Sequence, residues 1–158
     1  MDQSPWKDRL EAFHTPIQDY ARLSRTTYDL IISNPPFFSG GTFSQDQDRN
    51  NVRHTVKLPN GDLLSAARSL LSKEGRFCVI LPYIEGLQFK QMAKRYHLFC
   101  TKIVEVKPKK EKGVERLLLQ FEQTERKVEE SELVIQKDKR NDYTDDYIAL
   151  TKEFYLKM

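Results

Sequence analysis

The chain has 158 residues and a formal net charge of +3, which fits one domain with a core of its own and permits, without requiring, a polyanionic partner. Its two cysteines, Cys78 and Cys100, lack the paired spacing of a disulfide framework or a zinc site, so we expect reduced thiols and no metal. The sequence shows neither a signal peptide nor an apolar run long enough for a bilayer, so we expect a cytoplasmic protein without membrane contacts.

The first 27 residues predict two short elements. A strand is expected at Leu10–Phe13, after a turn-rich start. A helix is expected from Pro16 to Leu23, because proline is tolerated at the first helical position, where its missing N–H costs nothing.

The stretch from Tyr28 to Phe37 is the most informative part of the chain. Tyr28–Ser33 is a β-branched apolar run that predicts a strand buried on both faces, as in a parallel sheet. It stops at Asn34-Pro35-Pro36-Phe37, and ligands bind beyond the carboxyl ends of strands in open α/β sheets. The two prolines fix φ, remove two backbone donors and leave the Pro35 carbonyl aimed outward.

This turn has the groups needed to hold an amino group on a flat ring. The amide oxygen of Asn34 and the backbone oxygen of Pro35 are two acceptors for the two amine hydrogens, and Phe37 offers an apolar face for stacking. Such a grip turns the nitrogen lone pair toward an electrophile by positioning and electrostatics, without a metal or a nucleophilic side chain. The plainer alternative is a turn that only ends a strand.

Residues 38–61 predict a long polar loop directly after this turn. Arg49, Arg53 and His54 suit contacts to phosphates, and Phe38 can stack on a base, so the loop is a candidate wall for an extruded nucleotide. A solvated loop with incidental basic groups is the alternative. His54 is equally suited to a structural hydrogen bond, and nothing nearby supports a metal ligand.

The remainder of the chain predicts alternating helices and strands. Two successive βα units imply parallel strands, and a basic turn at residues 108–113 favours an antiparallel hairpin. The Lys cluster of that turn suits either RNA backbone contacts or protection of a sheet edge. The expected elements are a helix at 62–73 ended by Gly75, a strand at 77–81, a helix at 85–96, strands at 102–107 and 114–122, a short edge strand at 133–135, and a helix capped by Thr144.

Asn-Pro-Pro-aromatic after an apolar strand resembles the catalytic motif of class I, S-adenosylmethionine-dependent amino-methyltransferases. The flanks narrow this resemblance to the bacterial tRNA(Val) adenine-N6 methyltransferase family, and it covers nearly the whole chain. The flanking segments that carry it are Ser4-Pro5-Trp6, Arg49, Arg53-His54, Leu63-Leu64, the run from Gly75 to Pro82, and the run from Ala149 to Tyr155.

The resemblance implies a fold, a cofactor and a substrate. It implies an α/β, Rossmann-like class I fold whose mostly parallel sheet ends in an antiparallel hairpin, with S-adenosyl-L-methionine as cofactor and tRNA as partner. It assigns catalysis to Asn34, Pro35, Pro36 and Phe37, and substrate binding to Phe38, Arg49, Arg53 and His54. It assigns cofactor contacts to Asn34, Pro16 and Ile17; Pro16 stands where many relatives have an Asp that binds the adenine amine, and Ile17 suits either packing on that ring or a core role.

The same resemblance implies that the chain is the C-terminal part of one catalytic domain, with residues 1–27 a remnant of the cofactor-binding half and 28–158 the catalytic and substrate half. No glycine precedes position 40, so the expected Gly-rich cofactor turn is missing. We therefore expect an unpaired strand edge, which favours strand exchange or pairing with a second copy. Two alternatives stay open: a protein-glutamine N5-methyltransferase, and a catalytically dead domain that binds RNA or a partner chain.

Overall fold

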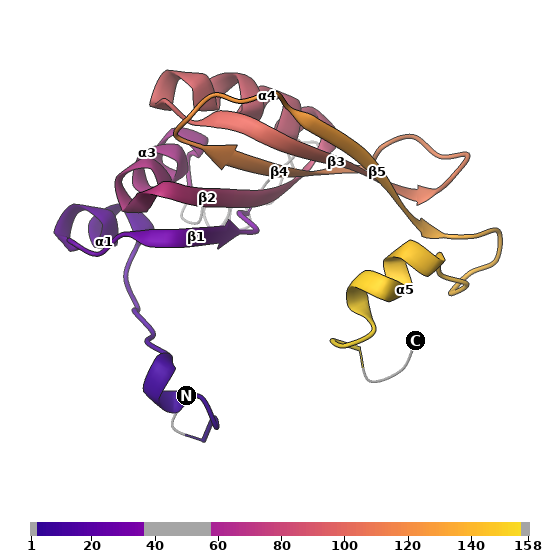
Figure 1. Ribbon diagram of the computed structural model, residues 1–158, viewed down its shortest axis with the longest axis horizontal. Helices are drawn as coiled ribbons and strands as arrows, with labels where there is room; N and C mark the ends of the chain where they lie inside the picture. Colours follow the sequence, from indigo (N-terminus) through magenta and orange to yellow (C-terminus); the bar gives the residue numbers. More distant parts are fainter. Residues whose placement is uncertain (1–2, 37–57, 156–158) are drawn as a thin grey trace, which may run out of the picture.

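One mixed sheet organises the computed structural model, which describes residues 3–36 and 58–155 (Figure 1). Its strand order is β1-β2-β4-β3-β5. The strands are β1 (Tyr28–Ser33), β2 (Leu71–Pro82), β3 (Phe99–Lys109), β4 (Arg116–Glu122) and β5 (Glu129–Gln136). The helices are α1 (Ile17–Leu23), α3 (Asn60–Leu70), α4 (Tyr83–Ala93) and α5 (Asp145–Thr151), with 3-10 turns η1 (Lys7–Arg9) and η2 (Lys94–Tyr96).

Four of these strands run in one direction and β4 runs against them. β1 pairs with β2 in parallel and β3 pairs with β5 in parallel, whereas β4 lies antiparallel between β2 and β3. The β3–β4 hairpin is the one predicted from the sequence, and β5 is the predicted edge strand. The expected fold class, a mostly parallel α/β sheet with an antiparallel hairpin, is therefore confirmed.

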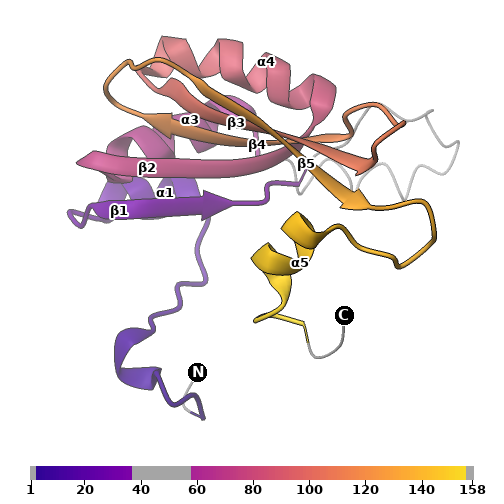
Figure 2. The same cartoon turned by 45° about the vertical axis from the view of Figure 1, so that its right-hand side comes forward.

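Helices α3 and α4 cover one face of the sheet, whereas α5 and the N-terminal segment lie on the other side (Figures 1 and 2). Alternate residues of β2 and β4 point into the covered face, as the period of a strand requires. Three fully buried rings, Phe77, Phe89 and Phe121, form its centre, with ring centroids 5.8 to 6.3 Å apart. None of the helices in the described ranges has both the length and the apolar character that a membrane span needs.

Three sequence expectations are wrong. Leu10–Phe13 is not a strand, because its backbone pairs with no described neighbour. β1 is not buried on both faces: it is the end strand of the sheet, and Leu30 and Ile32 are 50% and 74% exposed. The helix expected at 62–73 ends at Leu70, and Gly75 lies inside β2.

Within residues 3–36 and 58–155 no strand pairs with the outer side of β1, so the expected unpaired strand edge is present in the described part of the chain. Its expected consequence, strand exchange or pairing with a second copy, stays a prediction.

Candidate active site at the carboxyl end of β1

The Asn34-Pro35-Pro36 turn lies where the sequence places it, directly after β1. Pro35 is buried, whereas Asn34 and Pro36 on either side of it are exposed. No cis peptide bond occurs in the described residues, so Asn34–Pro35 and Pro35–Pro36 are both trans. The buried Pro35 anchors the turn, and the turn presents Asn34 to solvent.

The Asn34 side chain is exposed to solvent. Within residues 3–36 and 58–155, its amide makes no hydrogen bond. An Asn used only to close a turn would bond its own backbone nearby. The exposed amide therefore favours a binding role over a purely structural one.

A cavity of about 390 Å³ adjoins Asn34 on the sheet face opposite α3 and α4. It is walled by side chains of the three inner strands and of the end of β1, so its surface is mainly apolar. The lining residues are Ile32, Ser33, Asn34, Cys78, Val79, Ile80, Lys102, Val104, Leu118, Leu119 and Gln120. Apart from Asn34, these wall residues were not predicted from the sequence, although the alternation of Cys78 and Ile80 with buried Phe77 and Val79 was the signal that separates the two faces.

Among the described residues, the wall contains one charged side chain, Lys102, whose Nζ lies 3.8 Å from Glu129 Oε2. Gln120 Nε2 donates to Thr101 Oγ1 at 3.2 Å and to Glu122 Oε1 at 2.9 Å, which holds the amide in place. Burial raises the pKa of the Cys78 thiol, and burial likewise raises the pKa of Cys100. Both cysteines are free, as expected, and their thiols stay protonated near neutral pH, so neither is an activated nucleophile.

The proposed substrate residues Phe38, Arg49, Arg53 and His54, and the proposed catalytic Phe37, lie outside the described residues. Their assigned roles stay predictions.

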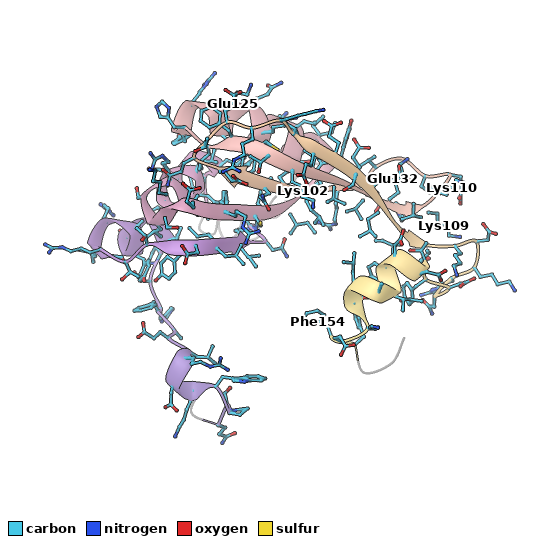
Figure 3. All side chains as sticks on the ribbon, in the orientation of Figure 1. Lys102, Lys109, Lys110, Glu125, Glu132 and Phe154 are labelled. Atoms are coloured by element: carbon cyan, nitrogen blue, oxygen red, sulfur yellow. The ribbon has the colours of Figure 1, made fainter. Side chains whose placement is uncertain are left out.

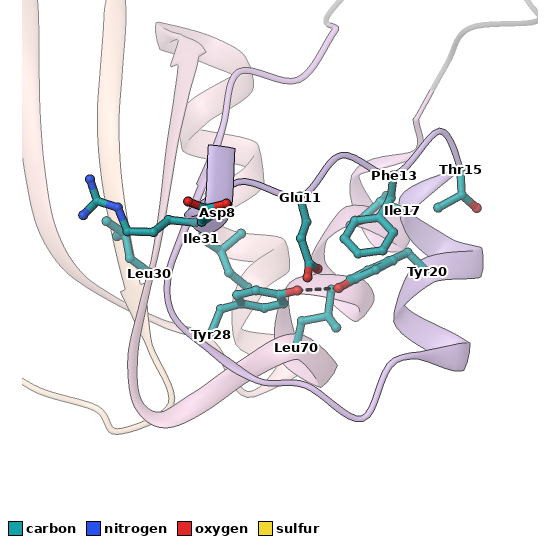
Figure 4. Close-up of a pocket in the computed structure, with 11 residues that line it drawn as sticks. Asp8, Glu11, Phe13, Thr15, Ile17, Tyr20, Tyr28, Leu30, Ile31 and Leu70 are labelled. Carbon is teal, nitrogen blue, oxygen red and sulfur yellow. Dashed lines mark hydrogen bonds between the residues drawn. The ribbon is translucent and has the colours of Figure 1, made fainter. Parts of the chain in front are cut away.

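A second cavity, of about 610 Å³, lies between the N-terminal segment, α1 and β1 (Figure 4). The hydroxyls of Tyr20 and Tyr28 hydrogen-bond to each other beside it, and this bond, together with burial and the nearby Glu11 carboxylate, raises the pKa of Tyr28. The Phe13 ring packs on Tyr20 with centroids 4.8 Å apart.

The two cavities separate the predicted cofactor residues. Ile17 lines the second cavity and Pro16 caps α1 beside it, whereas Asn34 lines the first. The structure thus does not bring Ile17 and Asn34 into one cavity, and a shared contact of these residues with a cofactor stays a prediction.

Comparison with known proteins gives a consistent group of relatives. The chain is 40% identical over 158 residues to tRNA1(Val) (adenine(37)-N6)-methyltransferase of Aliivibrio salmonicida, covering 99% of this chain and 65% of that protein. It is 40% identical to the protein of the same name from Flavobacterium johnsoniae, covering 99% and 67%, and 41% identical to that of Aliivibrio fischeri, covering 99% and 65%. The chain therefore spans about two thirds of the length of these relatives. A scan against protein-family models gives no match.

A solved structure supports the fold. A predicted O-methyltransferase from Agrobacterium tumefaciens superposes with a TM-score of 0.59 over 79% of this chain and 51% of that one, at 12% identity. At this identity the likeness concerns the fold alone, which is that of the class I methyltransferases.

Proposed function

Because the chain belongs to the family of the tRNA1(Val) (adenine(37)-N6)-methyltransferases, we propose that the protein transfers a methyl group from S-adenosylmethionine to N6 of an adenine in tRNA. The adenine beside the anticodon of tRNA(Val) is the proposed target, since the relatives carry this activity in their names. The proposal extends to the cytoplasm as the place where the protein meets tRNA.

The exposed Asn34 amide at the carboxyl end of β1, which forms no hydrogen bond with another residue of the described ranges, is the observation that carries this proposal. In open α/β sheets this is the edge where ligands bind. Neighbouring strand β2 ends at the same edge, because it is parallel to β1. An amide held there, next to an apolar cavity, suits a flat heterocycle with one polar substituent.

We assign the following roles to the turn. Asn34 Oδ1 and the Pro35 carbonyl oxygen accept the two N–H bonds of the adenine amine, and Phe37 stacks on the ring of the extruded base. Accepting both hydrogens draws the nitrogen lone pair out of conjugation with the ring and aims it at an electrophile. S-adenosylmethionine, when bound, would supply an electrophilic methyl carbon on a positively charged sulfur to the amine nitrogen that Asn34 and Pro35 hold.

The described residues fit the methyl-acceptor side of this reaction better than the cofactor side. Three of the described glycines allow close packing: a Cβ would meet Tyr96 at Gly61, Leu117 at Gly86, and the Tyr28 carbonyl at Gly75. None of these three glycines is needed for a cofactor. Asn34, Pro16 and Ile17 are the proposed cofactor contacts, with Ile17 offering an apolar surface to the adenine ring.

Product analysis tests the proposed function. The full-length natural protein is incubated with labelled S-adenosylmethionine and unmodified tRNA(Val), and the tRNA is then digested to nucleosides. Label in N6-methyladenosine is expected. Label in another nucleoside, or label only in added protein substrates, would contradict the proposal; the second result would indicate a glutamine methyltransferase.

A further inference from the structure

Four strands of the sheet end at one edge, and Asn34 lies on it. The parallel pairings, together with the antiparallel β4 between β2 and β3, give β1, β2, β3 and β5 the same direction. Their last residues are Ser33, Pro82, Lys109 and Gln136. The β3–β4 loop and the β5–α5 loop therefore stand on the same edge as the candidate active site (Figure 1).

These two loops and the strand ends beside them concentrate positive charge. Residues 107–116 and 137–142 hold eight basic and four acidic side chains, an excess of four that is larger than the net charge of +3 of the whole chain. Four of the basic side chains are exposed and form no ion pair within the described ranges: Lys110, Lys112, Lys139 and Arg140.

Other lysines of the same segments hold the loops in place. Lys109 Nζ donates to the Asp138 carbonyl oxygen at 2.6 Å, which ties the β3–β4 side to the β5–α5 loop (Figure 3). Lys137 pairs with Asp145 at the start of α5, with 3.1 Å between nitrogen and oxygen. These two contacts thus link the β3–β4 side, the β5–α5 loop and the start of α5, and so join the two loops that carry the four unpaired cations.

The distance from Asn34 suits a contact with the substrate away from the reacting base. β3 lies three strand spacings from β1, or roughly 14 Å at 4.8 Å each. Along the strand direction Lys109 stands six residues beyond Ser33, roughly 20 Å at 3.3 Å per residue. This offset has two parts. Ser33 lies level with Val79, and β2 continues for three residues from Val79 to Pro82. Pro82 and Val106 lie level with each other because both pair with Arg116, and β3 continues for three residues from Val106 to Lys109.

We infer that Lys110, Lys112, Lys139 and Arg140 form a phosphate-binding surface that holds the stem of the tRNA while its adenine reaches Asn34. The combined offset, roughly 25 Å, corresponds to about seven base pairs at 3.4 Å per pair. A surface at that distance contacts the backbone of a helical stem and carries no sequence information. This inference rests on the proposed function, and it adds the part of the chain that binds the nucleic-acid partner.

Two paired variants and a matched control test this surface in the full-length natural protein. The variants are Lys110→Ala/Lys112→Ala and Lys139→Ala/Arg140→Ala. The control is Lys94→Ala/Arg95→Ala, which removes two exposed cations from η2, at the opposite edge of the sheet. Direct tRNA binding is measured over a range of salt concentrations, and methyl transfer is measured over a range of tRNA concentrations.

Each variant should lose two phosphate contacts. At about 0.7 to 0.9 counter-ions released per contact, the slope of log K against log salt should become shallower by roughly 1.4 to 1.8. Taking variant and wild type to bind equally at ~1 M salt, the affinity of the variant at ~0.15 M salt should be about 10- to 30-fold below that of the wild type. KM for tRNA should rise by the same factor while kcat stays constant, because the adenine still reaches Asn34. The control should match the wild type in both assays.

The outcomes separate the two proposals. Methyl transfer with wild-type salt slope and KM in both loop variants would overturn the phosphate-binding surface and leave the proposed function standing. Binding of tRNA that depends on the loops, without methyl transfer by the wild type, would overturn the proposed function and support the surface. An equal loss in the control and the loop variants would also overturn the inference, because binding would then follow total charge.

Discussion

Substituting Gly75 by alanine should separate the start of β1 from β2. Gly75 is buried, and a Cβ there would lie 2.8 Å from the Tyr28 carbonyl oxygen and 2.9 Å from Leu71 Cδ1. The oxygen belongs to the backbone of β1, at the point where the β1–β2 register shifts. A side-chain rotation therefore cannot relieve the contact, and the two strands must move apart.

Two effects of opposite sign decide the magnitude. Replacing glycine by alanine lowers the conformational entropy of the unfolded chain and can stabilise a protein by about 0.4–1 kcal/mol. Forcing an extra methyl group into a packed site costs about 1–3 kcal/mol. Because the obstruction at Gly75 is backbone, we expect the cost to prevail and the free energy of unfolding to fall by about 1–2 kcal/mol.

Gly113→Ala is the matched control. A Cβ at Gly113 would meet no atom within 4 Å, and φ at Gly113 is not positive, so only the entropic gain applies and stability should stay equal or rise. Urea denaturation followed by circular dichroism measures both variants. If Gly75→Ala is as stable as Gly113→Ala, the packing argument at the β1–β2 junction is refuted.

Three further predictions concern the core and α5. Phe121→Ala should lower the free energy of unfolding by about 3–5 kcal/mol, because the ring is fully buried between two others; a loss under ~1 kcal/mol in urea denaturation would contradict this packing. Thr144→Ala should cost about 1 kcal/mol by the same measurement, because Thr144 Oγ1 caps α5 by accepting from the Tyr147 N–H at 3.3 Å; no change would show that the cap contributes nothing. The hydroxyl of Tyr155 hydrogen-bonds Tyr147 and, with burial, raises the pKa of Tyr147 to about 12, so Tyr155→Phe should lower that pKa toward 10 in a spectrophotometric titration, and an unchanged titration would exclude the bond.

The sequence predicted local features well where one short stretch determines them. The strand Tyr28–Ser33 lies where its β-branched run placed it, and Thr144 caps a helix as its residue type favours. The β3–β4 hairpin follows from two apolar runs around a polar turn. The Asn34 turn was found for the same reason, since prolines after a strand have strong local effects.

Features that depend on distant residues were not predictable in this way. The apolar residues of β1 do not reveal whether the strand lies inside a sheet or at its end, because burial depends on which strands lie beside it. A glycine after a helix usually marks a helix end, but Gly75 is needed for the close approach of the Tyr28 carbonyl. The joined loops at the carboxyl edge likewise depend on strand order, which brings Lys109 next to Asp138.

The central claim, that Asn34 grips the adenine amine, is tested most directly by single-turnover methyl transfer to tRNA(Val) with Asn34→Ala in the full-length natural protein. Loss of a preorganised polar group at a reacting centre costs about 10²–10³-fold in rate, so we expect a fall of that size with the affinity for tRNA unchanged. Asn34→Asp keeps an acceptor oxygen and should lose less. A rate for Asn34→Ala within threefold of the wild type would contradict the account.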